Sequence, residues 1–142
     1  MNGAAQTKYW APIPGEKTKK ISFIYHIDDI SRDEPFTVTV KGKPFAVVPY
    51  TIRNNDIARF DSPATTNATY LQDLKDDFDV LYAEAASRRQ MMSIRTHNRI
   101  SGIPGRVKLV EDCTKYAQKQ KGVVFMRKGD CQAGFVSFQS AS

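Results

Sequence analysis

The chain has 142 residues, of which 41% are hydrophobic and 25% are charged, and its formal net charge is +6. These values fit one globular domain with its own core and exclude a disordered or fibrous chain. No apolar run approaches the roughly 20 residues that span a bilayer, and residues 1–10 lack the apolar centre of a secretory signal. We therefore expect a cytoplasmic, intracellular protein or a virion component, with a single domain over residues 21–142.

Residues 1–20 predict an extended arm ahead of that domain. The segment 11–15 contains two prolines, which remove backbone donors and disfavour a helix. Tyr9 and Trp10 are large aromatic side chains on a segment that has no periodicity. Either they pack on their own domain or they bind a partner, because aromatic side chains provide contact area at low entropic cost.

Residues 21–52 predict β-structure. Side chains alternate over residues 21–27 as in a half-buried strand. Two further alternating stretches flank the turn sequence 41–44, where Gly42 can take the positive φ of a tight turn and Pro44 suits the start of an edge strand. We therefore expect a β-hairpin here.

The hairpin sequence over residues 36–48 resembles the hairpin of the Phd/YefM antitoxins, with Gly42-Lys43-Pro44 followed by an apolar run. In those proteins an amphipathic helix precedes the hairpin. Residues 25–35 are instead short, acidic and strand-like, so that part of the pattern is missing. The resemblance implies the hairpin and carries no functional residues to this chain.

The clearest helix prediction follows a polar loop over residues 53–68. Thr69 is expected to cap the helix, and Gln72 three residues later would complete a capping box. Apolar residues then recur at steps of three and four, which places them on one stripe of the helix. The stripe consists of Leu71, Leu74, Phe78, Leu81 and Ala85.

The remainder of the chain predicts a shorter helix among strands. Residues 106–110 suggest a short strand, residues 111–121 a helix, and residues 123–126 and 134–138 a strand pair across the turn 128–130. The predicted fold class is therefore α+β, a small single domain with a mixed or antiparallel sheet, one long amphipathic helix and one short helix.

Most sequence patterns of enzymes are missing from the chain. It has no glycine-rich phosphate loop, no Gly-x-Ser-x-Gly elbow and no His-Glu-x-x-His pair. A nucleophile pair of Cys113 and His97 is conceivable, but Cys113 lies on the apolar stripe of its helix, which favours a packed thiol. The carboxylates at 28–29 and 33–34 favour a solvated loop. We predict free thiols, no catalytic residue, no metal site, no cofactor and a protein that is not an enzyme.

The charge is distributed unevenly along the chain. Residues 21–84 carry eleven acidic and six basic side chains, whereas residues 85–142 carry three acidic and eleven basic ones. Residues 85–110 contain no acid, and five of their six basic residues are Arg, whose planar fork suits phosphate. We predict a non-enzymatic protein that contacts the phosphates of DNA or RNA within a larger complex. The nucleic-acid-binding residues would be Arg88, Arg89, Arg95, Arg99, Arg106, Lys108, Arg127 and Lys128.

A second hypothesis starts from the same charge separation. Acidic residues Asp73, Asp76 and Asp77 and the basic segment 88–108 would form complementary patches on one subunit. Such patches permit head-to-tail contacts between copies of a protein. Together with the aromatic arm, they would suit a structural subunit of a virion or another large assembly, acting through self-association or a protein partner.

Overall fold

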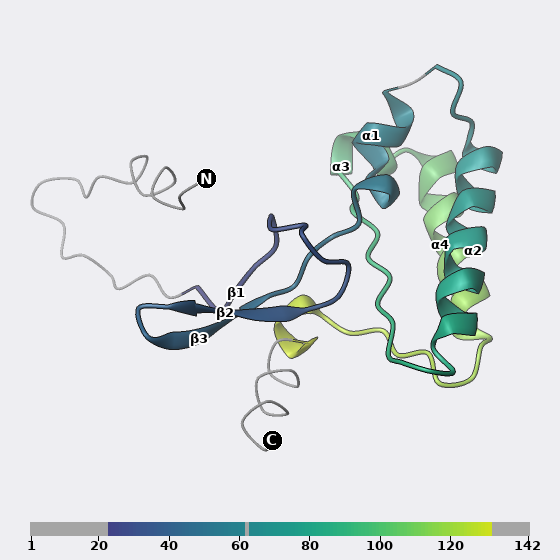
Figure 1. Ribbon diagram of the computed structural model, residues 1–142. Coiled ribbons are helices and arrows are strands. Elements are labelled where there is room, and N and C mark those ends of the chain that lie inside the picture. The colour runs from purple at the N-terminus through teal and green to yellow at the C-terminus, as the bar shows by residue number, and fades with distance from the viewer. Residues whose placement is uncertain (1–22, 62, 132–142) are drawn as a thin grey trace, which may run out of the picture.

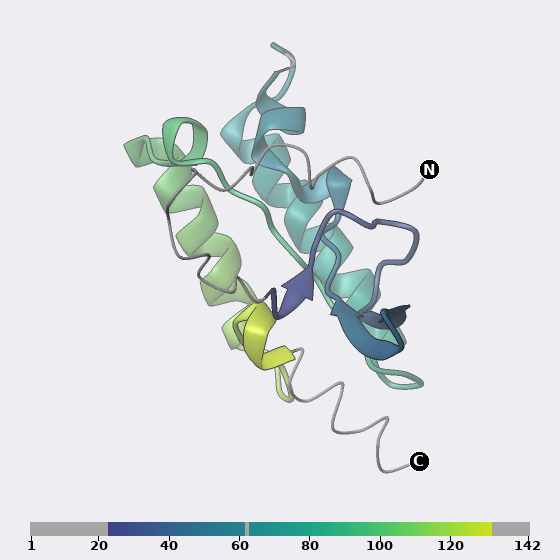
Figure 2. The same cartoon turned by 90° about the vertical axis from the view of Figure 1, so that its left-hand side faces the viewer.

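The structure, a computed structural model, describes residues 23–61 and 63–131 (Figure 1). The predicted arm with Tyr9 and Trp10 and the predicted strand 134–138 lie outside the described residues. Within them, a small sheet lies beside a group of helices, and the last described segment returns to the sheet (Figures 1 and 2). This arrangement confirms the α+β class and the mixed sheet.

The sheet has three strands in the order β1-β3-β2. Strand β1 (Tyr25–His26) pairs parallel to β3 (Lys43–Val47), and β2 (Phe36–Val40) pairs antiparallel to β3. The predicted hairpin is therefore present, and its register places Phe36 opposite Val47. The strand expected over residues 21–27 is reduced to two residues among those that the structure describes.

Two residues at the hairpin tip have positive φ, Lys41 at 51° and Gly42 at 75°. This is the backbone twist that a tight hairpin requires, and glycine adopts it without steric cost. Pro44 does not lie on an edge strand as expected, because β3 is the central strand. It is tolerated since β1 pairs with β3 only from Ala46 onward, beyond the proline.

The prediction of a polar loop over residues 53–68 is wrong. This part of the chain contains the 3₁₀ turn η2 (Ile52–Asn54) and the short helix α1 (Asp56–Phe60). The Asn55 side chain accepts a hydrogen bond from the Ile57 N–H at 3.3 Å and thereby caps α1. Asparagine suits both loops and helix caps, so its presence alone did not separate the two.

The long helix α2 (Asn67–Glu84) begins before the predicted cap. Thr66 is the N-cap, and Thr69 closes a reciprocal capping box with it. The Thr69 N–H donates to Thr66 Oγ1 at 3.1 Å, while the Thr66 N–H donates to Thr69 Oγ1 at 2.9 Å. The predicted apolar stripe is largely correct, because Leu74 and Phe78 are buried. Tyr70 is buried as well, although it was not predicted, and Ala85 is exposed.

The strand predicted over residues 106–110 is also wrong, because those residues belong to helix α4 (Pro104–Gln118). Pro104 occupies the first turn of α4, where the missing N–H of a proline costs nothing. Residues 123–126 are extended but belong to no strand within the described part, and residues 128–131 form a helical turn where a hairpin tip was expected.

The core between the helices consists of Tyr70, Leu74, Leu109 and Cys113, each at most 4% exposed. It joins α2 to α4, which lie side by side in both ribbon views (Figures 1 and 2). A second buried set, Ala46 to Val48, lies at the carboxyl end of β3. Helix α3 (Asn98–Ser101) contacts both α1 and α4.

Among the described residues, no helix is long and apolar enough to cross a membrane.

Candidate acid–base site

A buried carboxylate at the start of α1 is the most unusual polar feature of the described structure. Asp56 is 0% exposed, and the chain holds it there through backbone pairing of residues 54–56 with the segment around Arg95. The Arg95 N–H donates to the Asn54 carbonyl at 3.0 Å, and the Asp56 N–H donates to the Arg95 carbonyl at 3.1 Å. Two segments far apart in sequence are thereby joined beside α1.

This pairing brings His97 and Ser101 to the carboxylate. The His97 ring nitrogen Nδ1 lies 2.6 Å from Asp56 Oδ1, and the His97 backbone N–H donates to Asp56 Oδ2 at 2.7 Å. The Ser101 hydroxyl donates to the same Oδ2 at 2.6 Å. Both carboxylate oxygens are therefore satisfied by short hydrogen bonds, which a buried charge requires.

The chain folds locally so that these donors converge. His97 has extended backbone angles and precedes the short helix α3, while Ser101 is its last residue. A Cβ added at Gly102 would clash with the Asn98 carbonyl, so the tight end of α3 requires glycine. The turn of α3 thus places the Ser101 hydroxyl and the His97 N–H on one side, facing Asp56.

The pKa of Asp56 reflects two opposing effects. Burial alone would raise it, but the hydrogen bonds from the His97 N–H, the Ser101 hydroxyl and the His97 ring outweigh burial and lower it below 3.8. Asp56 is therefore a carboxylate at neutral pH. A carboxylate facing Nδ1 favours the tautomer in which Nδ1 carries the proton and Nε2 has a free lone pair.

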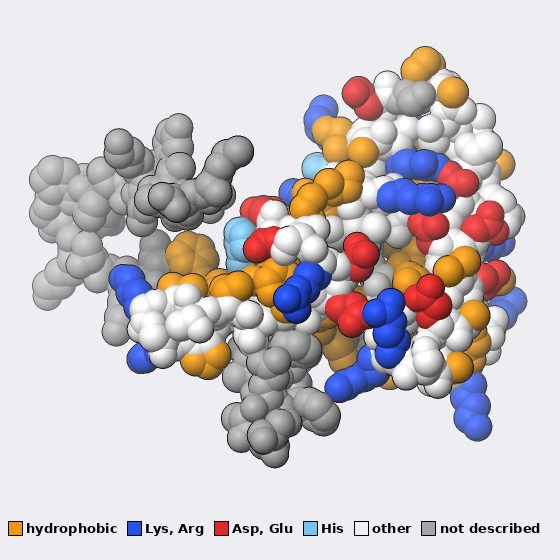
Figure 3. All heavy atoms as spheres, in the orientation of Figure 1, with side chains coloured by type: hydrophobic (Ala, Val, Ile, Leu, Met, Phe, Trp, Pro, Cys, Tyr) orange, Lys and Arg blue, Asp and Glu red, His pale blue; other side chains and the backbone are white. Residues whose placement is uncertain are grey.

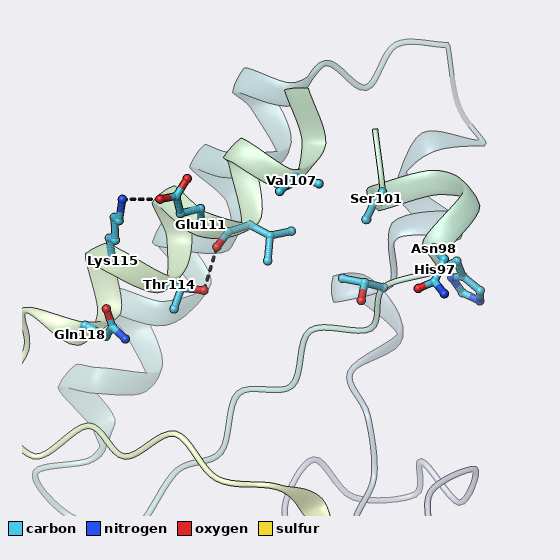
Figure 4. A pocket seen from close by; sticks show the side chains of 11 residues that line it. His97, Asn98, Ser101, Val107, Glu111, Thr114, Lys115 and Gln118 are labelled. Atoms are coloured by element: carbon cyan, nitrogen blue, oxygen red, sulfur yellow. Dashed lines mark hydrogen bonds and ion pairs between the residues drawn. The ribbon is translucent and has the colours of Figure 1, made fainter. Parts of the chain in front are cut away.

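His97 is also accessible, because its side chain is 31% exposed. It lies at the α3 end of a groove of about 530 Å³ that extends along α4 to Lys115 and Gln118 (Figure 4). Glu111 and Lys115 on the α4 side form an ion pair with each other. The arrangement is a buried carboxylate, an oriented imidazole with an available nitrogen, and an open groove beside them.

The eight basic residues of the predicted nucleic-acid surface are mostly occupied by partners within the chain. Arg88 pairs with Glu84, Lys108 with Asp112, and Arg127 with Asp130. Figure 3 shows basic and acidic side chains interspersed over the helices on that face. The remaining positions of the set are distributed over several segments: Arg89 follows α2, Arg95 lies in an extended segment, Arg99 in α3, Arg106 in α4 and Lys128 in the last helical turn.

Arg106 is held by contacts within the chain. Its guanidinium lies 3.7 Å from the centre of the Phe60 ring, and its Nη1 donates to the Ile100 carbonyl at 2.9 Å. It thereby links α4 to both α1 and α3. A smaller cavity of about 170 Å³ adjoins it and is also lined by Arg99.

The acidic residues predicted to bind a partner are also engaged within the chain. Asp73 pairs with Arg59, and Asp77 lies 3.4 Å from Arg53. Asp76 accepts a hydrogen bond from the Gln72 amide at 2.7 Å. These contacts hold α2 against the segment of η2 and α1.

The conceivable pair of Cys113 and His97 is not formed. Cys113 is 4% exposed in the core, where burial raises the pKa of its thiol, and His97 instead faces Asp56. Cys131, in the last helical turn, also has a pKa raised by burial, and both cysteines are free. Among the carboxylates at 28–29 and 33–34, Asp29 accepts a local bond from the Ser31 N–H.

Within the described residues, no group of three or more His, Cys, Asp or Glu side chains could hold a metal ion.

Asp56 was not predicted from the sequence as a functional residue. It follows two asparagines in what resembled a solvated loop, and 41 residues separate it from His97. Only one signal was available: a run of polar residues, 53–56, that begins a few residues after the apolar end of the predicted hairpin. Side chains at the carboxyl ends of strands are a common location of sites in α/β sheets.

Comparison with known proteins finds similarity to proteins that are named as enzymes. No family model matches the chain. A Schizosaccharomyces pombe protein named "Putative polysaccharide deacetylase" is 31% identical over 107 residues, which are 68% of this chain and 33% of that protein. The crystal structure of a "probable Polysaccharide deacetylase" from Pseudomonas aeruginosa PAO1 matches with a TM-score of 0.72 and 36% identity. That of Puue allantoinase matches with a TM-score of 0.71 and 36% identity.

The chain spans about a third of the length of the curated relative. Each structural match includes 78% of this chain and 38% of the chain in the crystal structure. These similarities contradict the prediction of a non-enzymatic protein that binds DNA or RNA, and equally the alternative of a structural virion or assembly subunit. Deacetylases and allantoinases are hydrolases, whereas both hypotheses describe a protein without catalytic activity.

Proposed function

We propose that this chain carries the acid–base part of a hydrolase of the deacetylase and allantoinase kind, with His97 as the proton-transfer group and Asp56 as the residue that positions it. The observation that carries the proposal is the 2.6 Å contact between His97 Nδ1 and a fully buried carboxylate. The 31–36% identity to enzymes of this kind supports the reaction class.

The chemistry follows from the geometry. Hydrolysis of an acyl bond adds water to the carbonyl carbon and breaks the bond from that carbon to the leaving nitrogen or oxygen. A proton must leave the water and another must reach the leaving atom. An imidazole can do both in turn, since its ordinary pKa lies near neutrality. Typical contributions of such proton transfer are about 10²–10⁴ in rate.

Asp56 determines which nitrogen of His97 performs this transfer. With Nδ1–H donating to Asp56, Nε2 is the nitrogen left to exchange protons with a substrate in the groove. The carboxylate also stabilises the imidazolium that forms when Nε2 takes a proton. Ser101 and the His97 N–H keep the carboxylate oriented without competing for Nε2.

The test compares hydrolysis by the wild-type chain and by the variant His97→Gln. Acetate release from N-acetylglucosamine oligomers and ring opening of allantoin would be measured separately. We expect the wild-type chain to hydrolyse one of the two, and His97→Gln to lower kcat/KM about 100-fold or more, because glutamine cannot accept and return a proton.

The other histidine provides a matched control. His26 lies on β1, and His26→Gln makes the same chemical change without touching Asp56. It should retain wild-type kcat/KM. Absence of hydrolysis of both substrates by the wild-type chain, or equal activity of His97→Gln, would contradict the proposal. Nitrogen NMR of His97 gives an independent readout, with the proton of the neutral ring expected on Nδ1 and a lone pair on Nε2.

A further inference from the structure

Two cationic side chains share one aromatic ring close to the Asp56–His97 pair. The Arg95 guanidinium carbon lies 4.4 Å from the centre of the Tyr50 ring, and Lys128 Nζ lies 5.9 Å from the same centre. Lys128 Nζ also donates to the Val48 carbonyl at 3.1 Å and to the Pro49 carbonyl at 2.8 Å. These contacts bring the last described helical turn to the end of β3.

Neither cation has an acidic partner within the described part of the chain. The ion pairs of that part involve other basic residues, namely Arg53, Arg59, Arg88, Lys108, Lys115 and Arg127, together with His97. Arg95 and Lys128 are nonetheless only partly exposed. Two positive charges that are held close together and partly shielded from water repel each other, and a bound anion would offset this repulsion.

The electrostatics of Lys128 agree with this geometry. Burial lowers its pKa, and the nearby Arg95 charge lowers it further, whereas Cys131 and Asp28 act weakly in the opposite direction. Lys128 also cannot move away freely, since two backbone carbonyls hold its ammonium group. The lysine retains a third N–H, and Arg95 has hydrogen-bond donors that no described residue uses.

The pair lies just beyond the carboxyl end of β3. Val48, Pro49 and Tyr50 directly follow β3, which runs parallel to β1, and ligands of parallel sheets bind beyond the carboxyl ends of the strands. Arg95 lies two residues before His97 on an extended segment. Residues two apart in such a segment face the same side, about 7 Å apart along the chain.

We infer that Arg95 and Lys128, held over Tyr50, form a carboxylate-binding site, so that the substrate of the proposed hydrolase carries a carboxylate in addition to the acyl group that His97 serves. This inference deepens the proposed function and rests on it. Arg95 would bind the carboxylate through its fork, and Lys128 would add a charge-assisted hydrogen bond. The substrate class is thus an anionic acylated amine or ureide, rather than a neutral one.

Two kinds of small molecule supply this chemistry, an acylated sugar acid and a ureido acid. N-acetylmuramic acid differs from N-acetylglucosamine by an ether-linked carboxylate, and N-carbamoylglycine differs from its amide by the charge alone. Binding of all four to the full chain would be measured by calorimetry at low ionic strength. The acid of at least one pair should bind about tenfold more tightly than its neutral counterpart, a difference of about 1.4 kcal/mol.

Arg95→Gln should reduce that preference to less than twofold while leaving affinity for the neutral compound unchanged. Arg95→Lys retains the charge and should keep part of the preference. Arg88→Gln is the matched control, because it removes one Arg charge at a side chain that is 66% exposed, and it should behave as wild type. Circular dichroism of each variant verifies that the fold is retained.

Each outcome decides the question. Preference for N-acetylmuramic acid assigns a sugar acid, and preference for N-carbamoylglycine assigns a ureido acid. Equal binding of acid and neutral compound in both pairs, or an unchanged preference in Arg95→Gln, overturns the inference. Failure of the proposed function is distinguishable, because His97→Gln would then leave hydrolysis unchanged while the carboxylate preference in binding persisted.

Discussion

Asp56 illustrates how one residue combines structural and chemical roles. Its carboxylate accepts hydrogen bonds from the His97 ring, the His97 N–H and Ser101. These bonds join α1 to α3 across 41 residues of sequence and at the same time orient the imidazole. Removal of the charge should therefore affect stability as well as the tautomer of His97.

We predict that Asp56→Asn destabilises the fold by about 3 kcal/mol at pH 7, since buried donors then meet a neutral amide that cannot accept all their bonds. Urea unfolding monitored by circular dichroism would measure this. Asp61→Asn at the exposed end of α1 is the control and should change the free energy of unfolding by less than about 0.5 kcal/mol.

The same residue predicts a pH dependence. Because its pKa is lowered in the folded chain, its contribution is complete above the unfolded-state pKa of about 3.8 and is lost as the pH falls through the lower folded value. Wild-type stability should decline below about pH 4, and the Asp56→Asn profile should be flatter there. Parallel profiles for the two proteins would show that other carboxylates cause the decline.

At the scale of secondary structure, caps decide where elements begin. Thr66 and Thr69 exchange hydrogen bonds at the start of α2, which satisfies two backbone donors that the first turn leaves without a partner. The amino-acid pattern predicted Thr69 as the cap and Gln72 as its partner in the capping box. In the structure the cap is Thr66, and Thr69 is the partner that closes the box.

Thr66→Ala should therefore destabilise the chain by about 1 kcal/mol, because alanine offers no acceptor to the Thr69 N–H. Thermal unfolding would show the change as a lower Tm. Thr65→Ala, one residue earlier and outside the capping box, should leave the Tm close to that of the wild type. An equal effect of both variants would indicate that loop packing rather than capping is responsible.

At the scale of the whole molecule, the helical core holds the site in place. Leu74 is 0% exposed between α2 and α4, and α4 in turn contacts α3, which carries the residues that meet Asp56. Leu74→Ala should cost about 2–5 kcal/mol in the free energy of unfolding through lost burial and a cavity. Val80→Ala, on the same helix but 59% exposed, should cost far less in the same denaturant titration.

The sequence determined those parts of the structure whose causes are local. The hairpin followed from Gly42 and its apolar flanks, and the stripe of α2 followed from the spacing around Leu74 and Phe78. Errors arose where one residue type suits two structures. Asparagine is common both in loops and at the start of a helix, where Asn55 lies. Proline is common both in loops and in the first turn of a helix, where Pro104 lies.

The tertiary structure alone decided the candidate site, because its contacts join residues that no local pattern relates. Asp56 meets His97, and Lys128 meets the end of β3, through chain paths of about 40 and 80 residues. The sequence showed a basic half and an acidic half, and charge counts carry no information on which side chains face each other. Folding paired some of those charges internally. It also brought Lys128 to the same aromatic ring as Arg95, which lies two residues before a histidine that a buried carboxylate orients.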